Sequence, residues 1–368
     1  MEEHHNDNLE PKKDDSIENQ TPEPTIETNI HPIILPSDVT HQDEETVNFK
    51  NRVDLSELQE GIKLIKDEIG KVIVGQKGMI DMLIASILAN GHSLIEGVPG
   101  VAKTISAKLL AKSLDIGFSR IQFTPDLMPS DILGTSIFDM KTSEFEFKKG
   151  PIFSNMILID EINRAPAKTQ AALFEVMEER QITIDGHRYV MDLPFIVLAT
   201  QNPIEQEGTY RLPEAQLDRF LFKIDIDYPN LEEEIEIINR EQNLKGDSKI
   251  DKVTSHLSRE QISRFQDLVN QVIIESHLVK YIADIIVNTR NNPFLYLGAS
   301  PRASIAILRA SKAFAAMNGR DFVTPEDIKQ AAIPVLQHRI IVTPEREMEG
   351  VNTKQIIRQI IEAVEIPR

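Results

Sequence analysis

The sequence predicts an α/β domain built on a five-stranded parallel sheet, followed by an all-α helical domain. Between Asn48 and Tyr228, short β-rich apolar runs alternate with helical patterns, as they do in a mostly parallel sheet with helices on both faces. A glycine-rich turn follows the first of these runs and favours a sheet that binds phosphate. Beyond Pro229 the sequence predicts no further strand, because apolar residues there recur with a helical period.

Three segments are expected along the chain. Residues 1–45 contain no glycine, several prolines and many acidic side chains, a composition typical of a disordered tail. Residues 46–229 are expected to form the α/β nucleotide-binding core, and residues 230–368 the helical lid domain. Two interpretations of the tail stay open: a solvated leader without a role, and a segment that docks a partner or inhibits the chain.

Composition excludes several classes of protein. The 368 residues include no cysteine, so disulfides, thiolate metal sites and cysteine nucleophiles are excluded. The net charge is −18, and the first 50 residues, with 13 acids against 3 bases, account for −10 of it. The sequence contains no basic stripe suited to nucleic acid, and no apolar run approaches the roughly 18 residues that span a bilayer. We therefore expect a cytoplasmic protein with no nucleic-acid partner and no stable membrane insertion.

Five apolar runs are the expected strands of the sheet. Each is short, and several are rich in the β-branched and aromatic residues that favour strands. The runs span Ser93–Glu96, Arg120–Phe123, Met156–Asp160, Phe195–Thr200 and Phe222–Ile226.

Helical patterns fill the rest of the chain after residue 229. Apolar residues spaced three and four apart predict two buried helix faces. Prolines that follow Ser300 and Thr324 mark two helix starts, because serine and threonine cap helices and proline favours their first turn. The first face consists of Ile262, Phe265, Val269 and Val272, and the second of Leu278, Ile282 and Ile285.

The glycine-rich turn after the first strand predicts a nucleotide phosphate site. Backbone N–H groups of such a turn point at the β-phosphate, Lys103 reaches the β- and γ-phosphates, and the Thr104 hydroxyl ligates Mg²⁺. The residue before the lysine is Ala102, where the common pattern has glycine, so a glycine-proline loop that caps an ordinary helix is the alternative. The turn consists of Gly97, Val98, Pro99, Gly100, Val101, Ala102, Lys103 and Thr104.

A short turn shortly before the first strand is a candidate for contact with adenine. It comprises Gly75 and Gln76, directly after Val74. Three residues carry little specificity on their own.

Two carboxylates follow the strand Met156–Asp160. A carboxylate at the carboxyl end of a strand beside the phosphate turn can hold Mg²⁺ through water, and its neighbour can orient or deprotonate the attacking water. We assign Asp160 to Mg²⁺ and Glu161 to water. The alternative is that both acids cap a helix or face solvent.

A second buried strand, Phe195–Thr200, ends in Gln201 and Asn202. A strand inserted between the other two would bring Asn202 to the γ-phosphate and the attacking water. The alternative is a turn amide that satisfies the local backbone.

Two arginines are candidates for contact with the γ-phosphate. Arg219 comes at the end of a short helical segment, where it can reach the nucleotide of a neighbouring subunit and neutralise charge that builds during phosphoryl transfer. Arg302 lies in the first turn of a lid helix, where a contact with the γ-phosphate would tie lid position to nucleotide state. The alternatives are an ion pair of Arg219 with Asp218 or Glu214, and a solvated Arg302.

Two hairpins are expected as insertions in the α/β core. Residues Gln181–Val190 alternate around an Asp185-Gly186 turn, a strong hairpin signal. Thr135–Ile137 and Phe145–Phe147 flank the other hairpin. Either hairpin could be a moving element or a plain structural one.

Taken together, the ordered motifs resemble those of the AAA+ ATPases, and more narrowly those of the MoxR family, over roughly residues 50–368. Ala102 matches the phosphate loop of this family. The blocks that carry the resemblance are Glu96–Thr104, Arg120–Asp131, Asp160–Pro166, Ala199–Pro203, Leu212–Phe220 and Ser300–Arg302.

The resemblance implies roles for single residues. Gly97, Gly100, Lys103 and Thr104 would form the Walker A motif, and Asp160 and Glu161 the Walker B motif. Asn202 would be sensor 1, Arg219 the arginine finger and Arg302 sensor 2.

The resemblance further implies an ATPase that uses ATP and Mg²⁺ and assembles as a homo-hexamer. Such proteins act as chaperones that remodel or activate a client, often a protein with a von Willebrand factor A domain. Three alternatives stay open: a nucleotide-dependent scaffold with little turnover, a nucleic-acid motor, and the motor subunit of a metal chelatase.

Overall fold

A five-stranded parallel sheet with the strand order β2-β5-β8-β1-β9 lies at the centre of the fold. The computed structural model describes residues 53–203, 209–242 and 253–366, so the tail expected at 1–45 lies outside the described residues. The strands are β1 (His92–Gly97), β2 (Phe118–Gln122), β5 (Met156–Asp160), β8 (Ile196–Gln201) and β9 (Phe220–Ile226). These are the five predicted strands, and the predicted fold class is confirmed.

Strand β8 comes late in the chain but is inserted between β5 and β1. Its residue Ala199 is the register partner of Ile159 on β5 and of Leu94 on β1. Because the three strands are parallel, their carboxyl ends meet at one edge of the sheet. The insertion expected from the sequence is therefore present.

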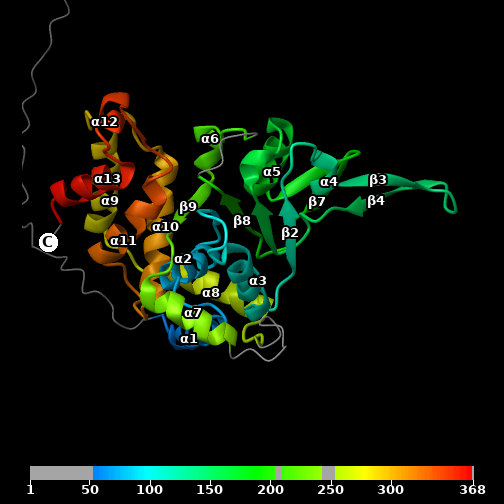
Figure 1. The fold of residues 1–368 in the computed structure, drawn as a ribbon, viewed down its shortest axis with the longest axis horizontal. Coiled ribbons are helices and arrows are strands. Elements are labelled where there is room, and N and C mark those ends of the chain that lie inside the picture. Colours follow the sequence, from blue (N-terminus) through cyan, green and yellow to red (C-terminus); the bar gives the residue numbers. More distant parts are fainter. Residues whose placement is uncertain (1–52, 204–208, 243–252, 367–368) are drawn as a thin grey trace, which may run out of the picture. The chain divides into compact units, whose positions relative to one another are not determined.

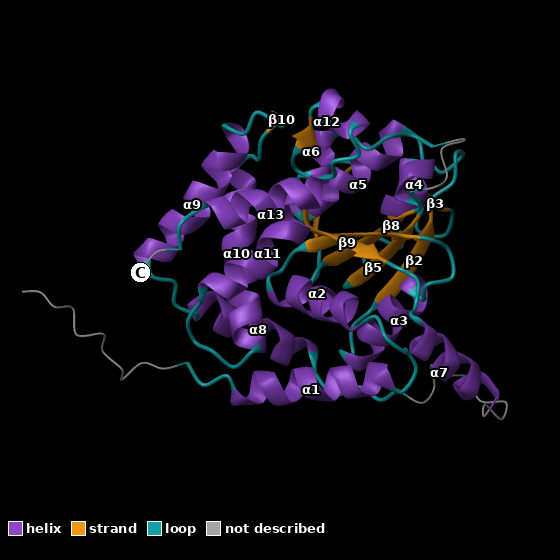
Figure 2. Cartoon of the chain, turned by 60° about the vertical axis from the view of Figure 1, so that its left-hand side comes forward, coloured by secondary structure: helices purple, strands orange, loops and turns teal. Residues whose placement is uncertain are grey.

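Both faces of the sheet are buried, each in its own apolar core. Successive side chains of a strand alternate between the faces, so Leu94 belongs to one core and Ile95 to the other. This explains why the central strands Met156–Asp160 and Ile196–Gln201 are nearly continuous buried runs rather than alternating ones. Figure 2 shows α2 and α3 on one side of the sheet and α5 on the other. The helices that cover the faces are α1 (Ser56–Gly70), α2 (Lys77–Leu88) and α3 (Lys103–Ser113) on the first, and α5 (Ala167–Glu179) on the second.

Both predicted hairpins are confirmed, and they contact each other. One pairs β3 (Gly134–Asp139) with β4 (Glu144–Lys149), and the other pairs β6 (Gln181–Ile184) with β7 (His187–Val190). The Ser136 hydroxyl hydrogen-bonds to the Asp185 carboxylate of the second hairpin. Figure 1 shows β3 and β4 reaching away from the sheet. Among the short helices, α4 (Pro129–Leu133) directly precedes β3, the 3₁₀ helix η2 (Ile162–Arg164) follows β5, and α6 (Glu214–Leu217) precedes β9.

The chain after β9 is almost entirely helical. Both predicted apolar faces are buried, and helices begin after Ser300 and Thr324 as expected. The prediction of no strand beyond residue 229 is wrong in one detail: β10 (Leu295–Leu297) pairs with β11 (Ile341–Val342) across a separation in sequence too long for a local hairpin signal. The helices are α7 (Leu231–Gln242), α8 (Arg259–Gln271), α9 (Ser276–Arg290), α10 (Pro301–Met317), α11 (Pro325–Leu336), α12 (Pro344–Met348) and α13 (Thr353–Ala363).

The first helices after residue 229 contact the α/β core. Arg240 of α7 donates to the Gly70 carbonyl at 2.8 Å, and Gln266 of α8 donates to the Ile87 carbonyl at 2.7 Å. The domain boundary at 229 stays a prediction. Among the described helices, none is long and apolar enough to cross a bilayer.

His92 is a buried histidine at the start of β1. Its Nδ1 accepts the Val197 N–H at 3.0 Å, and its Nε2 lies 3.2 Å from the Met177 carbonyl. Burial, together with the charge of Arg180, lowers the pKa of His92 to about 4. The imidazole is therefore neutral in the folded protein, with its proton on Nε2.

We predict that His92 makes stability pH-dependent between pH 7 and pH 5. The unfolded chain binds a proton below pH 6.5, whereas the folded chain does not until about pH 4, so the free energy of unfolding falls by about 2 kcal/mol over this interval. Chemical denaturation of wild type and His92→Gln at pH 7 and pH 5 measures how steeply the free energy of unfolding of each protein changes with pH. His187→Gln, which changes an exposed histidine, is the matched control and keeps the wild-type slope. A wild-type slope in His92→Gln would contradict the prediction.

Candidate functional site

The glycine-rich turn joins the carboxyl end of β1 to the amino end of α3. Gly100 has φ +88° and Ala102 has φ +64°, so the chain turns sharply before Lys103. A Cβ on Gly97 would lie 2.9 Å from the Ile226 carbonyl oxygen, which explains glycine there. The Lys103 ammonium lies back over the turn and donates to the Gly97 carbonyl at 2.6 Å. The turn thus presents backbone N–H groups, the positive end of α3 and one lysine, the groups that bind phosphate.

The turn at Gly75 and Gln76 lies at the same end of β9. Both residues have left-handed backbones, with φ of +68° and +54°. The Gln76 amide donates to the Asp227 carbonyl at 3.2 Å, one residue beyond the Ile226 that packs against Gly97. The structure therefore brings the candidate adenine turn and the phosphate turn to one place.

Asp160 is the last residue of β5, and both oxygens of its carboxylate accept hydrogen bonds. Oδ2 accepts from the Arg120 guanidinium at 2.6 Å, and Oδ1 accepts from the Thr200 hydroxyl at 3.1 Å. The residue is only 7% exposed, and such hydrogen bonds fix its orientation. Thr200 belongs to β8, so the inserted strand holds the Asp160 carboxylate in place.

Glu161 has a strained backbone directly beyond the strand. Its φ is +57°, which is uncommon for a residue other than glycine. Its N–H donates to the Thr200 hydroxyl at 3.1 Å, and its carboxylate accepts from Gln122 at 2.9 Å and lies 3.1 Å from Arg164. Strain of this kind persists only where surrounding contacts hold it, and it is common at functional sites.

Asn202 follows β8 directly and is 8% exposed. The register partners Glu96 and Gln201 place the ends of β1 and β8 side by side. Asn202 therefore lies at the same sheet edge as the phosphate turn and the two carboxylates.

The oxygen donors at this edge fit Mg²⁺. No cluster of three acidic or histidine ligands that could hold a metal on its own occurs in the described parts of the chain. Mg²⁺ is commonly bound through one or two protein oxygens together with substrate phosphates and waters. The Asp160 carboxylate and the hydroxyl of Thr104, in the first turn of α3, are the donors of that kind.

Arg219 and Arg302 come together, but at the other end of the sheet. The Glu178 carboxylate pairs with both, at 3.4 Å from Arg219 and 2.9 Å from Arg302. Arg219 also donates to the Phe174 carbonyl at 2.9 Å. The alternative ion pairs of Arg219 with Asp218 or Glu214 are not formed, because Asp218 binds Arg339 and Glu214 binds Arg211.

The two arginines lie far from the phosphate turn of their own chain. Arg219 immediately precedes β9, and β9 runs parallel to β1, so its amino end lies beside the amino end of β1. The six residues of β1 span about 16 Å at the usual rise per residue. A side chain at the amino edge of the sheet cannot bridge that distance to a phosphate at the carboxyl edge.

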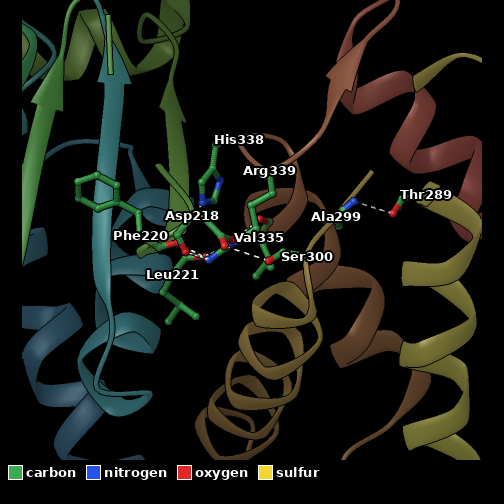
Figure 3. A network of polar contacts seen from close by, with 9 residues as sticks. All are labelled: Asp218, Phe220, Leu221, Thr289, Ala299, Ser300, Val335, His338 and Arg339. Atoms are coloured by element: carbon green, nitrogen blue, oxygen red, sulfur yellow. Dashed lines mark hydrogen bonds and ion pairs between the residues drawn. The ribbon is translucent and has the colours of Figure 1, made fainter. Parts of the chain in front are cut away.

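A buried ion pair fixes the segment that carries Arg219. Figure 3 shows the Arg339 side chain, which comes from the turn after α11, pointing toward Asp218, which lies just before β9. The Arg339 guanidinium lies 2.7 Å from Asp218 Oδ1 and donates to the Leu221 carbonyl at 3.2 Å. Asp218 Oδ2 accepts the Ser300 hydroxyl at 2.9 Å. The Ser300 hydroxyl, predicted to cap α10, therefore donates to Asp218 and makes no capping hydrogen bond with its own helix.

The neighbouring His338 is buried and neutral. Its Nε2 lies 3.0 Å from the Phe220 carbonyl. Burial, with Arg339 beside it, lowers the pKa of His338 well below its usual range. Arg339 is therefore the charged partner of Asp218 in this network.

Sequence reasoning missed the residues that position the site. These contacts join segments far apart in the chain, so no local spacing marks them. Arg120 and Gln122 did carry a signal, because they are polar residues at alternate positions of a strand next to β5. The missed residues are Arg120, Gln122, Glu178, Thr200 and Arg339.

Comparison with known proteins matches two family models. The model described as "ATPase family associated with various cellular activities (AAA)" matches residues 92–222, which include the phosphate turn, Asp160, Glu161 and Asn202. The model described as "AAA lid domain" matches residues 287–360.

Relatives match over nearly the whole described chain. YeaC of Bacillus subtilis is 45% identical, with 82% of this chain and 93% of YeaC covered. A protein named Chaperone MoxR1 from Mycobacterium tuberculosis is 42% identical, with 82% of this chain and 81% of the relative covered. The crystal structure of a "putative ATPase" from Cytophaga hutchinsonii superimposes with a TM-score of 0.79 at 47% identity, covering 85% of this chain and 97% of that one.

We predict that Arg339→Met lowers the free energy of unfolding by about 3–5 kcal/mol, because it leaves the Asp218 carboxylate and several strand carbonyls without their partner. Denaturant unfolding of wild type and variant measures the change. Arg346→Met, which removes the exposed partner of Glu349, is the matched control and costs less than about 1 kcal/mol. Equal effects of the two changes would show that the buried pair adds nothing to stability.

Proposed function

The chain belongs to the MoxR family of AAA+ ATPases, and on that premise we propose that it hydrolyses ATP at the subunit interfaces of a homo-hexameric ring and uses hydrolysis to remodel a client protein. One observation carries the proposal. The phosphate turn lies at the carboxyl edge of the sheet, whereas Arg219 and Arg302 lie at the amino edge. A second copy must supply the arginines if they contact the γ-phosphate.

The first half of the site binds the nucleotide. Lys103 and the N–H groups of the turn Gly97–Ala102 bind the β- and γ-phosphates, and Gly75 and Gln76 contact the adenine side. The Thr104 hydroxyl and Asp160 hold Mg²⁺, which neutralises charge on the β- and γ-phosphates when bound. Supporting this, the phosphate turn has the left-handed residues and the open space at Gly100 that close approach of a phosphate requires.

Glu161 and Asn202 act on the attacking water. A carboxylate accepts the water proton, and the Asn202 amide orients the water against the γ-phosphate. The contact of Glu161 with Gln122 and Arg164 holds the carboxylate at the strand end. The backbone strain at Glu161 supports an active position for this side chain.

Arg219 and Arg302 complete the site of a neighbouring subunit. In the isolated chain Glu178 pairs with both guanidinium groups. A γ-phosphate that carries more charge than a carboxylate can replace Glu178 as their partner, and the guanidinium groups then stabilise the charge on the equatorial oxygens. Hydrolysis on this view depends on assembly.

An exposed apolar stripe on α7 supports a subunit interface on the nucleotide side. Leu231, Ile235 and Ile238 are 76%, 51% and 55% exposed and follow one another at helical spacing. Glu233 of the same helix lies against Gly75 of the adenine turn. Exposed apolar patches of this kind are typical of protein interfaces.

The hairpin β3–β4 is the proposed contact with the client. Phe138, Met140 and Phe145 are 48%, 88% and 73% exposed near its tip. Helix α5 follows the carboxylates at residues 160 and 161, carries Glu178 and leads directly into the other hairpin. A movement of α5 when Glu178 releases the arginines would therefore reach both hairpins. From the family resemblance we propose a von Willebrand factor A domain protein as the client.

We predict that Lys103→Ala and Arg219→Ala are each inactive alone and active when mixed. Lys103→Ala removes nucleotide binding, whereas Arg219→Ala binds nucleotide but loses about 10³-fold or more in turnover. Mixed rings pair an intact phosphate turn with an intact arginine at roughly a quarter of their interfaces, since the interfaces are heterologous. The rate of steady-state ATP hydrolysis is measured for each variant alone and for their mixture, over a range of protein concentrations.

Several outcomes would contradict the proposal. Mixtures as inactive as the separate variants would rule out shared sites, and specific activity independent of protein concentration would rule out assembly-dependent hydrolysis. If Glu161→Gln still supported the client, a scaffold with little turnover would replace the motor.

We also predict that Thr200→Val lowers kcat about 10- to 100-fold with little change in KM for ATP. The change keeps the side-chain shape but removes the hydroxyl that holds both Asp160 and the Glu161 backbone. Steady-state kinetics measures kcat and KM for ATP separately. Thr183→Val, on an exposed position of β6, is the matched control, and equal kinetics in the two variants would remove Thr200 from the site.

A further inference from the structure

A cavity of about 360 Å³ lies at the amino edge of the sheet, between α5, the start of β9 and α10. Its walls also include Asn90, just before β1, and His92, the first residue of β1. Five arginines line it, whereas the sequence motifs point to Arg219 and Arg302 alone. The arginines that line it are Arg180, Arg219, Arg302, Arg309 and Arg339.

Among the described residues that line the cavity, these five guanidinium groups face two carboxylates, Glu178 and Asp218. Asp218 is bound by Arg339 and by the Ser300 hydroxyl, and Glu178 is shared by Arg219 and Arg302. Both carboxylates are therefore engaged, and the cavity keeps an excess of positive charge.

Arg180 and Arg309 form the part of the cavity without a counter-charge. Within the described chain, neither has a carboxylate partner: Arg180 donates only to the Asn90 carbonyl at 2.9 Å, and Arg309 forms no ion pair. Burial, followed by the charge of Arg309, lowers the pKa of Arg180. Two cations that repel each other in a cavity favour an anion between them.

The helix α10 places Arg302 and Arg309 on one face. They are seven residues apart, close to two helical turns, which separates them by about 10 Å along the axis. Ile305 and Ala306, between them, line the same cavity. A phosphate chain that meets Arg302 at its end can therefore meet Arg309 further along.

We propose that Arg309, with Arg180, binds the phosphate chain of the nucleotide that is seated on the phosphate turn of a second copy of this chain. This inference rests on the proposed function, in which Arg219 and Arg302 reach the γ-phosphate of that nucleotide. Arg309 and Arg180 contact phosphates nearer the ribose. They are binding residues, so they set the affinity of the assembled site more than its rate.

The same cationic cavity could take its anion from solution instead of from a second copy. The chemistry is shared, because a free nucleotide or inorganic phosphate carries the same oxygens. The two sources differ in whether the phosphate turn of another subunit is needed, and the experiment separates them on that point.

The first arm measures ATP hydrolysis by Arg309→Ala in the full chain, at a protein concentration at which wild-type specific activity no longer rises. We expect KM for ATP to increase about tenfold or more, as loss of a hydrogen bond to a charged group implies, and kcat to fall far less than in Arg219→Ala. Arg309→Lys keeps part of the affinity. Arg358→Ala, on an exposed position of α13, is the matched control and keeps the wild-type KM. Because Arg309 is exposed on a helix, its replacement by alanine leaves the fold intact.

The second arm mixes Arg309→Ala with Lys103→Ala. If Arg309 acts on a neighbour's nucleotide, the mixture contains interfaces with the wild-type KM, so hydrolysis at low ATP exceeds that of either variant. Fluorescent ATP is also titrated onto Lys103→Ala alone. If Lys103→Ala still binds ATP, and adding Arg309→Ala to that variant removes the binding, the anion binds in the cavity without a second copy. That result would overturn the inference.

Failure of the inference is distinct from failure of the proposed function. An unchanged KM in Arg309→Ala, with Arg219→Ala still inactive and still rescued by Lys103→Ala, would overturn the role of Arg309 alone. Full activity of Arg219→Ala would overturn the shared site itself, and the role of Arg309 with it.

Discussion

The parallel direction of the strands is the constraint on which the rest of this structure depends. Parallel strands gather all their carboxyl ends at one edge, where β1, β5 and β8 deliver the phosphate turn, Asp160 and Asn202. The same geometry puts the start of β9, and with it Arg219, at the opposite edge. Arg219 and the phosphate turn are thus separated within one chain by the length of a strand.

Each edge is stabilised by polar contacts between segments far apart in sequence. At the carboxyl edge the Thr200 hydroxyl contacts both the Asp160 carboxylate and the Glu161 N–H. At the amino edge Arg339 pairs with Asp218, and Glu178 pairs with Arg219 and Arg302. Helix α5 connects the edges, since it begins after the carboxylates and carries Glu178 in its last turn. A change of partner at Glu178 has a direct route to the carboxylates and the hairpins.

Charge distinguishes the two ends of the sheet. The carboxyl edge offers carboxylate and amide oxygens beside Lys103, with Arg120 and Arg164 paired to the two carboxylates, which suits a magnesium-bound phosphate chain. The amino edge offers five arginines against two carboxylates, which suits the charge that a transferring phosphoryl group develops. The buried histidines at the amino edge, His92 and His338, have lowered pKa values and add no positive charge there. Arginine alone therefore sets the sign of that edge.

The sequence by itself determined the five strands of the central sheet, the two hairpins, both helix starts and the family, because apolar periodicity, turn residues and the phosphate turn act over a few residues. It also indicated the insertion of β8 between β5 and β1. The tertiary structure alone decided that Arg302 lies with Arg219 rather than near Lys103, and that Glu178, Thr200 and Arg339 hold the site. Those contacts join residues from 39 to 124 positions apart, and no local pattern encodes which distant partner a polar side chain meets.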